Sequence, residues 1–169
     1  MLPILTPDIL DFTSHSAEQT ARIGTRLGGL LAAGDVICLS GDLGAGKTVL
    51  AAGIGKGWGA LEPVNSPTFV FVHEHRRRRD DERLNHVDCY RLSGVEDVDT
   101  IGIDEILMGN DIAVIEWPER IESLLPEERL WIHLSAFDDF TEKRQLQFRA
   151  TGKHYQQLLV EFRRKAFGA

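Results

Sequence analysis

The chain has 169 residues, of which 43% are hydrophobic and 27% charged, and its formal net charge is −7. These values are ordinary for one globular domain with its own hydrophobic core. The acidic balance disfavours tight, unaided binding to nucleic acid. The chain has only two cysteines, no apolar run as long as a membrane span, and no basic segment of a signal peptide at its start. We therefore expect a cytoplasmic protein that does not act at a membrane.

The first predicted helix begins after Ser16, which has the capping-box spacing with Gln19. Apolar side chains then recur at helical spacing as far as Leu31, and Gly34 is the expected residue just beyond the helix end. The apolar run of residues 36–39 predicts a buried strand. This strand leads directly into a glycine-rich segment.

That segment, GDLGAGKT at residues 41–48, matches the P-loop pattern. Its glycines let the backbone wrap closely, so that several N–H groups point at a phosphate. A helix predicted over residues 47–56 adds the positive end of its dipole. We expect Lys47 to reach the β- and γ-phosphates and the Thr48 hydroxyl to bind Mg²⁺. The residues predicted to bind the nucleotide here are Gly41, Asp42, Gly44, Ala45, Gly46, Lys47, Thr48 and Val49.

Phosphoryl chemistry also needs a carboxylate at the end of a neighbouring strand. The apolar run of residues 112–115 ends in Glu116, as in a Walker B element with glutamate in place of aspartate. Asp88 is the second candidate, either for binding Mg²⁺ through water or for positioning the attacking water. Each acid could instead be an ordinary strand-end carboxylate. Ser66 and Thr68 are candidates for sensing the γ-phosphate, or are plain turn residues.

The remaining sequence predicts a hairpin from strands at 69–73 and 84–90, with the charged tip RRRRDDER between them. A helical stretch at 95–107 is broken at Gly102, and late strands are expected at 130–134 and 145–150. The final amphipathic helix places one apolar face at Tyr155, Leu158, Leu159, Phe162 and Ala166. Strands and helices in this order predict an α/β domain with a mixed sheet.

Two features have competing interpretations. The arginines at 76–79 are followed at once by acids, which favours a solvated tip, although contact with RNA or a partner stays open. Three histidines, His73, His75 and His86, could suggest zinc, but no cysteine pair accompanies them.

The run Asn85–Asp88 lacks the lysine of a guanine-specificity element, so we expect ATP rather than GTP.

The motifs GDLGAGKT, SPTF, HVDCYRL and IEWPER, in this order and spacing, resemble the TsaE (YjeE) family, P-loop ATPases of bacterial tRNA threonylcarbamoyladenosine synthesis. The resemblance runs from about residue 16 to about residue 149. It implies a single domain over residues 1–169 with a P-loop NTPase-like, three-layer α/β fold. Its sheet would be mixed and mostly parallel, with added antiparallel strands.

The resemblance also implies an activity. The family member is an ATPase that uses ATP and Mg²⁺, is weak alone, and works with the proteins TsaB and TsaD. Those partners transfer threonylcarbamoyl to the adenosine beside the anticodon of tRNAs reading ANN codons, so tRNA is reached indirectly through the complex. The ATPase does not make the tRNA bond itself.

Residue roles follow from the matched motifs. Lys47, Asp88 and Glu116 correspond to the catalytic group, and Thr48, Glu116 and Asp88 to the metal-side residues. The resemblance places Ser16 and Glu18 near adenine and Arg144 near the nucleotide. Val49 stands where a second threonine or serine is common, which leaves the metal-binding hydroxyl at Thr48 intact.

Two other function classes remain open from the sequence. A small-molecule P-loop kinase would share the phosphate loop, and the arginines at 76–79 could act as its lid, although the flanking acids speak against this. A nucleotide-sensing adaptor would bind ATP without needing the acids for hydrolysis.

Overall fold

The computed structural model describes residues 6–65, 71–93 and 102–168. The strands are β1 (Ile9–Ser14), β2 (Val36–Ser40), β3 (Val72–Arg76), β4 (Arg83–Asp88), β5 (Ile112–Glu116), β6 (Arg129–Ala136) and β7 (Arg144–Thr151). The helices are α1 (Ala17–Gly28), α2 (Lys47–Trp58), α3 (Ile103–Met108), α4 (Lys153–Phe167) and the 3₁₀ helix η2 (Pro118–Leu124). None of the helices in this described part of the chain is long and apolar enough to cross a membrane.

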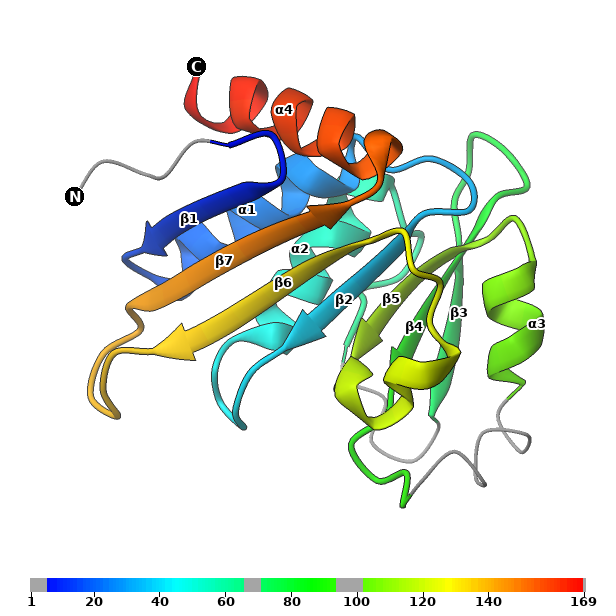
Figure 1. Ribbon diagram of the computed structural model, residues 1–169, viewed down its shortest axis with the longest axis horizontal. Helices are drawn as coiled ribbons and strands as arrows, with labels where there is room; N and C mark the ends of the chain where they lie inside the picture. The colour runs from blue at the N-terminus through cyan, green and yellow to red at the C-terminus, as the bar shows by residue number, and fades with distance from the viewer. Residues whose placement is uncertain (1–5, 66–70, 94–101, 169) are drawn as a thin grey trace.

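All seven strands form one sheet in the order β1-β7-β6-β2-β5-β4-β3 (Figure 1). The inner strands β6, β2, β5 and β4 are parallel neighbours. Antiparallel pairs add β7 and β1 at one edge and β3 at the other. The predicted mixed α/β sheet with antiparallel additions is therefore confirmed. Its topology places β2 between β6 and β5, so the loop after β2 leaves from the middle of the sheet.

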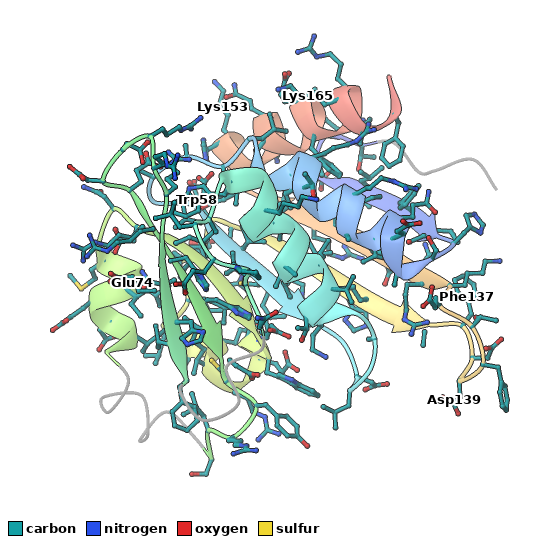
Figure 2. The ribbon with its side chains drawn as sticks, turned by 180° about the vertical axis from the view of Figure 1, so that it is seen from behind. Trp58, Glu74, Phe137, Asp139, Lys153 and Lys165 are labelled. Atoms are coloured by element: carbon teal, nitrogen blue, oxygen red, sulfur yellow. The ribbon has the colours of Figure 1, made fainter. Side chains whose placement is uncertain are left out.

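Helices cover both faces of the sheet. α1 and α2 lie side by side across one face, as the view from behind shows (Figure 2), and α4 joins them. Leu39, Ile54 and Phe162 belong to the core on this side. A second core on the opposite face contains Cys38 from β2 and Ile103 from α3, together with residues of β4, β5 and η2. The resulting three layers hold β2 and β5 fully buried, which fixes the positions of the loops that follow them.

The structure corrects several predicted boundaries. α1 ends at Gly28, well before Gly34, because two consecutive glycines favour the helix poorly and the Gly29 N–H caps the carbonyls of the last turn. Gly34 instead takes a left-handed conformation in the turn before β2. The hairpin strands are offset from the prediction, since β3 begins at Val72 and β4 ends at Asp88. Residues 69–70 and 95–101 of the predicted elements lie outside the described residues.

β1 was absent from the sequence prediction. Its inward side chains include only Leu10 and Phe12 as large apolar residues, which is a weak alternation signal. The strand forms because it pairs along its whole length with β7, from Ile9 opposite Arg149 to Ser14 opposite Arg144, far along the chain. This pairing brings the start of α1 beside the start of β7.

α1 and α2 approach so closely that glycines are required between them. A Cβ on Gly28 would lie 2.0 Å from the Ile54 carbonyl oxygen, and one on Gly57 would lie 1.9 Å from the Thr25 carbonyl oxygen. Both obstacles are backbone atoms of the facing helix, so neither can move aside without separating the helices. The P-loop helix is therefore held by main-chain contact with α1.

We expect Gly28→Ala to lower the free energy of unfolding by about 1–3 kcal/mol, the usual range for overpacking a tight contact. Gly29→Ala is the matched control, because the nearest atoms to its Cβ are 3.8 Å away and its φ of −68° suits alanine. Urea unfolding of both variants measures the difference. Equal stability of the two variants would contradict the close contact.

Both cysteines are small buried side chains, as predicted. Cys38 and Cys89 are free thiols with no exposed surface, and burial raises the pKa of each to about 12. The reactive form of a thiol is the thiolate, which such a group does not populate at about pH 8. We expect neither thiol of the native protein to react with a chromogenic disulfide reagent, and both to react after unfolding in guanidinium. Prompt labelling of the native protein would contradict this burial.

The charged tip between β3 and β4 is organised around Arg77. This side chain is buried, lies over the Trp58 ring at 4.8 Å, and donates to Asp80 at 2.7 Å and 2.6 Å. It also pairs with Glu82. Arg76 pairs with Glu74, labelled in Figure 2, at 3.3 Å. Arg77 therefore anchors the tip to the end of α2 and is not free to act as a lid arginine.

Candidate nucleotide site

The glycine-rich loop lies between β2 and α2, so the predicted strand–loop–helix order is confirmed. Gly41 has φ of 140°, and a Cβ there would lie 2.3 Å from the Leu134 carbonyl oxygen. Gly46 is the N-cap of α2 and has φ of 102°, a left-handed conformation that glycine adopts without strain. These two positions shape a backbone concavity at the N-terminus of α2, which is the arrangement that accepts an anion.

Lys47 lies inside this loop. Its Nζ donates to the carbonyl oxygens of Gly41 at 2.5 Å and Asp42 at 2.7 Å, and it lies 4.4 Å from the centre of the Trp117 ring. Burial lowers the pKa of the ammonium group, and the Glu116 carboxylate partly offsets this effect. The loop thus holds one buried positive charge against its own carbonyls, where an entering phosphate would meet it.

The metal-side residues meet at the carboxyl ends of β2, β5 and β4. Glu116 ends β5 opposite both Leu39 and Asp88. The Thr48 hydroxyl donates to Oε1 of the buried Glu116 at 3.3 Å. The structure therefore brings Thr48, in the first turn of α2, together with Glu116, the acid that the sequence predicts at the end of β5.

Asp88 lies beside this pair but makes a different contact. Its Oδ1 accepts the Tyr90 N–H at 2.9 Å. Burial raises the pKa of the Asp88 carboxyl; the Tyr90 N–H opposes this, and the Glu116 carboxylate adds to it. Since a carboxylate with a raised pKa is a stronger base, Asp88 is suited to accept a proton from, or to orient, a water molecule.

The oxygen ligands here fit Mg²⁺. This ion takes oxygen donors and binds through one or two protein groups together with phosphates and water, rather than in a complete protein cage. Thr48 and Glu116 supply a hydroxyl and a carboxylate oxygen within 3.3 Å of each other. Within residues 6–65, 71–93 and 102–168, no three His, Cys, Asp or Glu side chains could hold a metal by themselves. The Thr48 hydroxyl and the Glu116 carboxylate match the one or two protein oxygens that Mg²⁺ takes when phosphates and water supply the rest.

Two residues at the site were missed or undervalued from the sequence. His86 is fully buried and its Nε2 lies 2.6 Å from Oε2 of Glu116. Its signal was the two-residue spacing from Asp88, which puts both side chains on the same face of β4. Trp117 has φ of 58°, rare for a residue with a side chain, and packs against Tyr90 with ring centres 4.8 Å apart and the ring planes tilted by 44°. This backbone turn brings the indole over Lys47.

Of the three residues expected near adenine or the nucleotide, Arg144 contacts the phosphate loop, whereas Ser16 and Glu18 lie at the start of α1. Arg144 starts β7 opposite Ser14 and donates to the Gly44 carbonyl oxygen at 3.1 Å. Ser16 caps α1, its hydroxyl accepting the Gln19 N–H at 3.0 Å, and Glu18 is exposed on the first turn. The structure places Arg144 against the P-loop, and β1 carries the start of α1 to the same end of the sheet.

The other predicted loop residues fall into three groups. Asp42 is exposed, while its carbonyl oxygen accepts Lys47. Ala45 is buried, and Val49 lies partly buried in α2 behind the loop. Ser66 and Thr68 lie outside the described residues, which stop before them at Asn65.

A surface pocket lies elsewhere, on the face of β6 and β7 that carries Trp131, His133 and Arg149. None of the predicted site residues lines it.

Comparisons with known proteins show relatives that match most of the chain. Residues 14–146 match the family model described as "Threonylcarbamoyl adenosine biosynthesis protein TsaE". The chain is 43% identical over 126 residues to the tRNA threonylcarbamoyladenosine biosynthesis protein TsaE of Treponema pallidum, covering 75% of this chain and 91% of the relative. It is 35% identical over 155 residues to the protein of the same name from Bacillus subtilis, covering 92% and 94%.

A solved structure is similar over nearly the whole chain. The crystal structure of Bacillus subtilis YdiB superposes with a TM-score of 0.77 at 32% sequence identity, covering 93% of this chain and 95% of that one. On these grounds the chain belongs to the TsaE family.

Proposed function

We propose that this protein is the ATP-binding and ATP-hydrolysing component needed to form N6-threonylcarbamoyladenosine next to the anticodon of tRNAs reading ANN codons. The observation that carries the proposal is the meeting of Lys47, Thr48 and Glu116 at the carboxyl ends of neighbouring parallel strands. A phosphate loop with a metal-side acid is the arrangement of P-loop nucleotide hydrolysis. The names of the relatives supply the pathway in which it acts.

Each residue has a role that follows from its position. Main-chain N–H groups around Gly44 and Gly46, with the N-terminus of α2, bind the phosphate oxygens. Lys47 exchanges its loop carbonyl partners for the terminal phosphates, so a buried charge is ready before the nucleotide arrives. Thr48 and Glu116 would hold Mg²⁺, which would supply positive charge beside the phosphates. Asp88 positions the attacking water and accepts its proton.

We propose further that the activity is weak alone and rises when the protein works with TsaB and TsaD. Phosphoryl transfer is usually accelerated by an arginine that stabilises the transition-state charge. Arg144, the arginine described at the loop, donates instead to the carbonyl oxygens of Thr141, Lys143 and Gly44. A partner that rearranges this contact or supplies a further cation would account for the stimulation. tRNA is reached through this complex.

The test is phosphate release from ATP by the purified protein, with and without TsaB and TsaD. We expect slow release alone and faster release with both partners. Labelled ATP is offered in parallel with a mixture of cellular metabolites, because a labelled product other than inorganic phosphate would favour a kinase. Of the arginines at 76–79, Arg77 is unavailable for such a lid, since Asp80 and Glu82 hold its side chain. Partner-independent activity would contradict the proposal.

A further inference from the structure

His86 has polar contacts on both sides of its ring, although no part of the residue is exposed. Its Nε2 lies 2.6 Å from Oε2 of Glu116, and its Nδ1 lies 3.2 Å from the carbonyl oxygen of Asn65. A carboxylate only accepts hydrogen bonds, so Nε2 carries a hydrogen and donates it, whether or not Nδ1 is also protonated. The ring is therefore clamped between β5 and the end of the segment that follows α2.

The two oxygens of Glu116 have different partners. Oε1 faces the Thr48 hydroxyl at 3.3 Å, whereas Oε2 faces His86. The His86 contact is the shorter of the two and lies deeper, with side-chain exposures of 0% and 3% for the pair. Consequently His86 fixes the orientation of the carboxylate plane, and only Oε1 is directed at the place where Thr48 and a nucleotide-bound metal would meet.

From this geometry we infer that His86 is a positioning residue, which holds Glu116 so that one oxygen is presented to Mg²⁺. The inference rests on the proposed function, because it assumes that a metal–nucleotide complex binds at the P-loop. Hydrogen-bond partners behind a metal ligand typically change metal affinity or activity by about 10- to 100-fold when removed. Among the described residues, the hydrogen-bond partners of His86 are Asn65 and Glu116, whereas Lys47 donates to Gly41 and Asp42 of the phosphate loop.

Three substitutions separate the hydrogen bond from simple packing. In His86→Gln the side-chain amide reaches the position of Nε2 and still donates to Glu116. In His86→Asn the shorter amide reaches only the position of Nδ1, so the contact with Asn65 survives while Glu116 loses its donor. His86→Leu fills similar volume and makes neither contact.

The measurement is the affinity for a non-hydrolysable ATP analogue by titration calorimetry, first with excess EDTA and then across a Mg²⁺ series. We expect all variants to match wild type in EDTA, because the loop and Lys47 are unchanged. With Mg²⁺, His86→Gln should stay within about threefold of wild type, while His86→Asn and His86→Leu should need about 10- to 100-fold more Mg²⁺ for the same affinity. Thermal unfolding of each variant confirms that it is folded.

Several results would overturn the inference. Wild-type Mg²⁺ dependence in His86→Asn and His86→Leu would show that Glu116 needs no positioning. If His86→Gln needs as much additional Mg²⁺ as His86→Asn and His86→Leu, packing of the ring matters rather than the hydrogen bond that Nε2 donates. If the variants lose as much affinity for the ATP analogue in EDTA as they do with Mg²⁺, the substitutions damage the nucleotide site as a whole. If wild type itself binds no nucleotide, it is the proposed function that fails, and this outcome is distinct from the other three.

Discussion

Replacing Lys47 with alanine is expected to weaken ATP binding by about 10- to 100-fold. The ammonium group is buried and already directed into the loop, where it donates to Gly41 and Asp42. Hydrogen bonds to a charged group contribute about 1.5–3 kcal/mol, and each 1.4 kcal/mol corresponds to a factor of about ten in affinity. Equilibrium dialysis with labelled ATP and Mg²⁺ measures the loss directly.

The matched control is Lys56→Ala, which removes an exposed lysine from the last turn of the same helix. It should bind ATP like wild type, because Lys56 lies two turns or more from the phosphate loop. The rate of ATP hydrolysis by Lys47→Ala should fall by a larger factor than its affinity for ATP. The reason is that the ammonium group also stabilises negative charge that develops on the transferred phosphate. Wild-type affinity in Lys47→Ala would contradict the assignment of this residue.

The second large effect is expected at Glu116. Glu116→Gln keeps the size of the side chain but removes the negative charge that a metal prefers in its ligand. Since a bound metal contributes several kcal/mol to charge stabilisation in phosphoryl transfer, we expect the rate of ATP hydrolysis to fall by about 100-fold or more. Binding of ATP in EDTA should remain close to wild type, because the loop and Lys47 are intact. Phosphate release measured across a Mg²⁺ series shows both effects.

Glu105→Gln serves as the control, because Glu105 is an exposed acid on α3. It removes the same charge from the protein without touching β5. A comparable loss of hydrolysis in the control would point to net charge rather than to a metal ligand. An unchanged rate of hydrolysis and unchanged Mg²⁺ dependence in Glu116→Gln would contradict the assignment of Glu116 as a metal-binding residue.

The local parts of the site were predictable from the sequence. The run from β2 through the glycines to α2 is contiguous, so residue spacing alone predicted strand, loop and helix. Glu116 was predictable because the apolar run of residues 112–115 ends at it, and the carboxyl ends of parallel strands meet at one edge of a sheet. The end of α1 was not predicted correctly, because apolar residues continue at helical spacing to Leu31, beyond the consecutive glycines Gly28 and Gly29 at which the helix ends.

The contacts that connect distant segments could not be read from the sequence. His86 meets Glu116 only because β4 and β5 pair in one particular register. Arg144 reaches the P-loop only because β7 lies beside β6, which is itself the neighbour of β2. Both arrangements depend on strand order, which has no local sequence signal. The charged tip was ambiguous for the same reason, since the burial of Arg77 requires Trp58 from α2.

The central claim is that backbone amides, Lys47 and the Thr48–Glu116 pair together bind ATP with Mg²⁺. Calorimetric titration of the intact, folded protein with a non-hydrolysable ATP analogue tests it most directly. The structure predicts about one nucleotide bound per chain, with affinity that rises when Mg²⁺ is added and falls again with EDTA. Absence of binding heat in folded protein, both alone and with TsaB and TsaD present, would contradict the account.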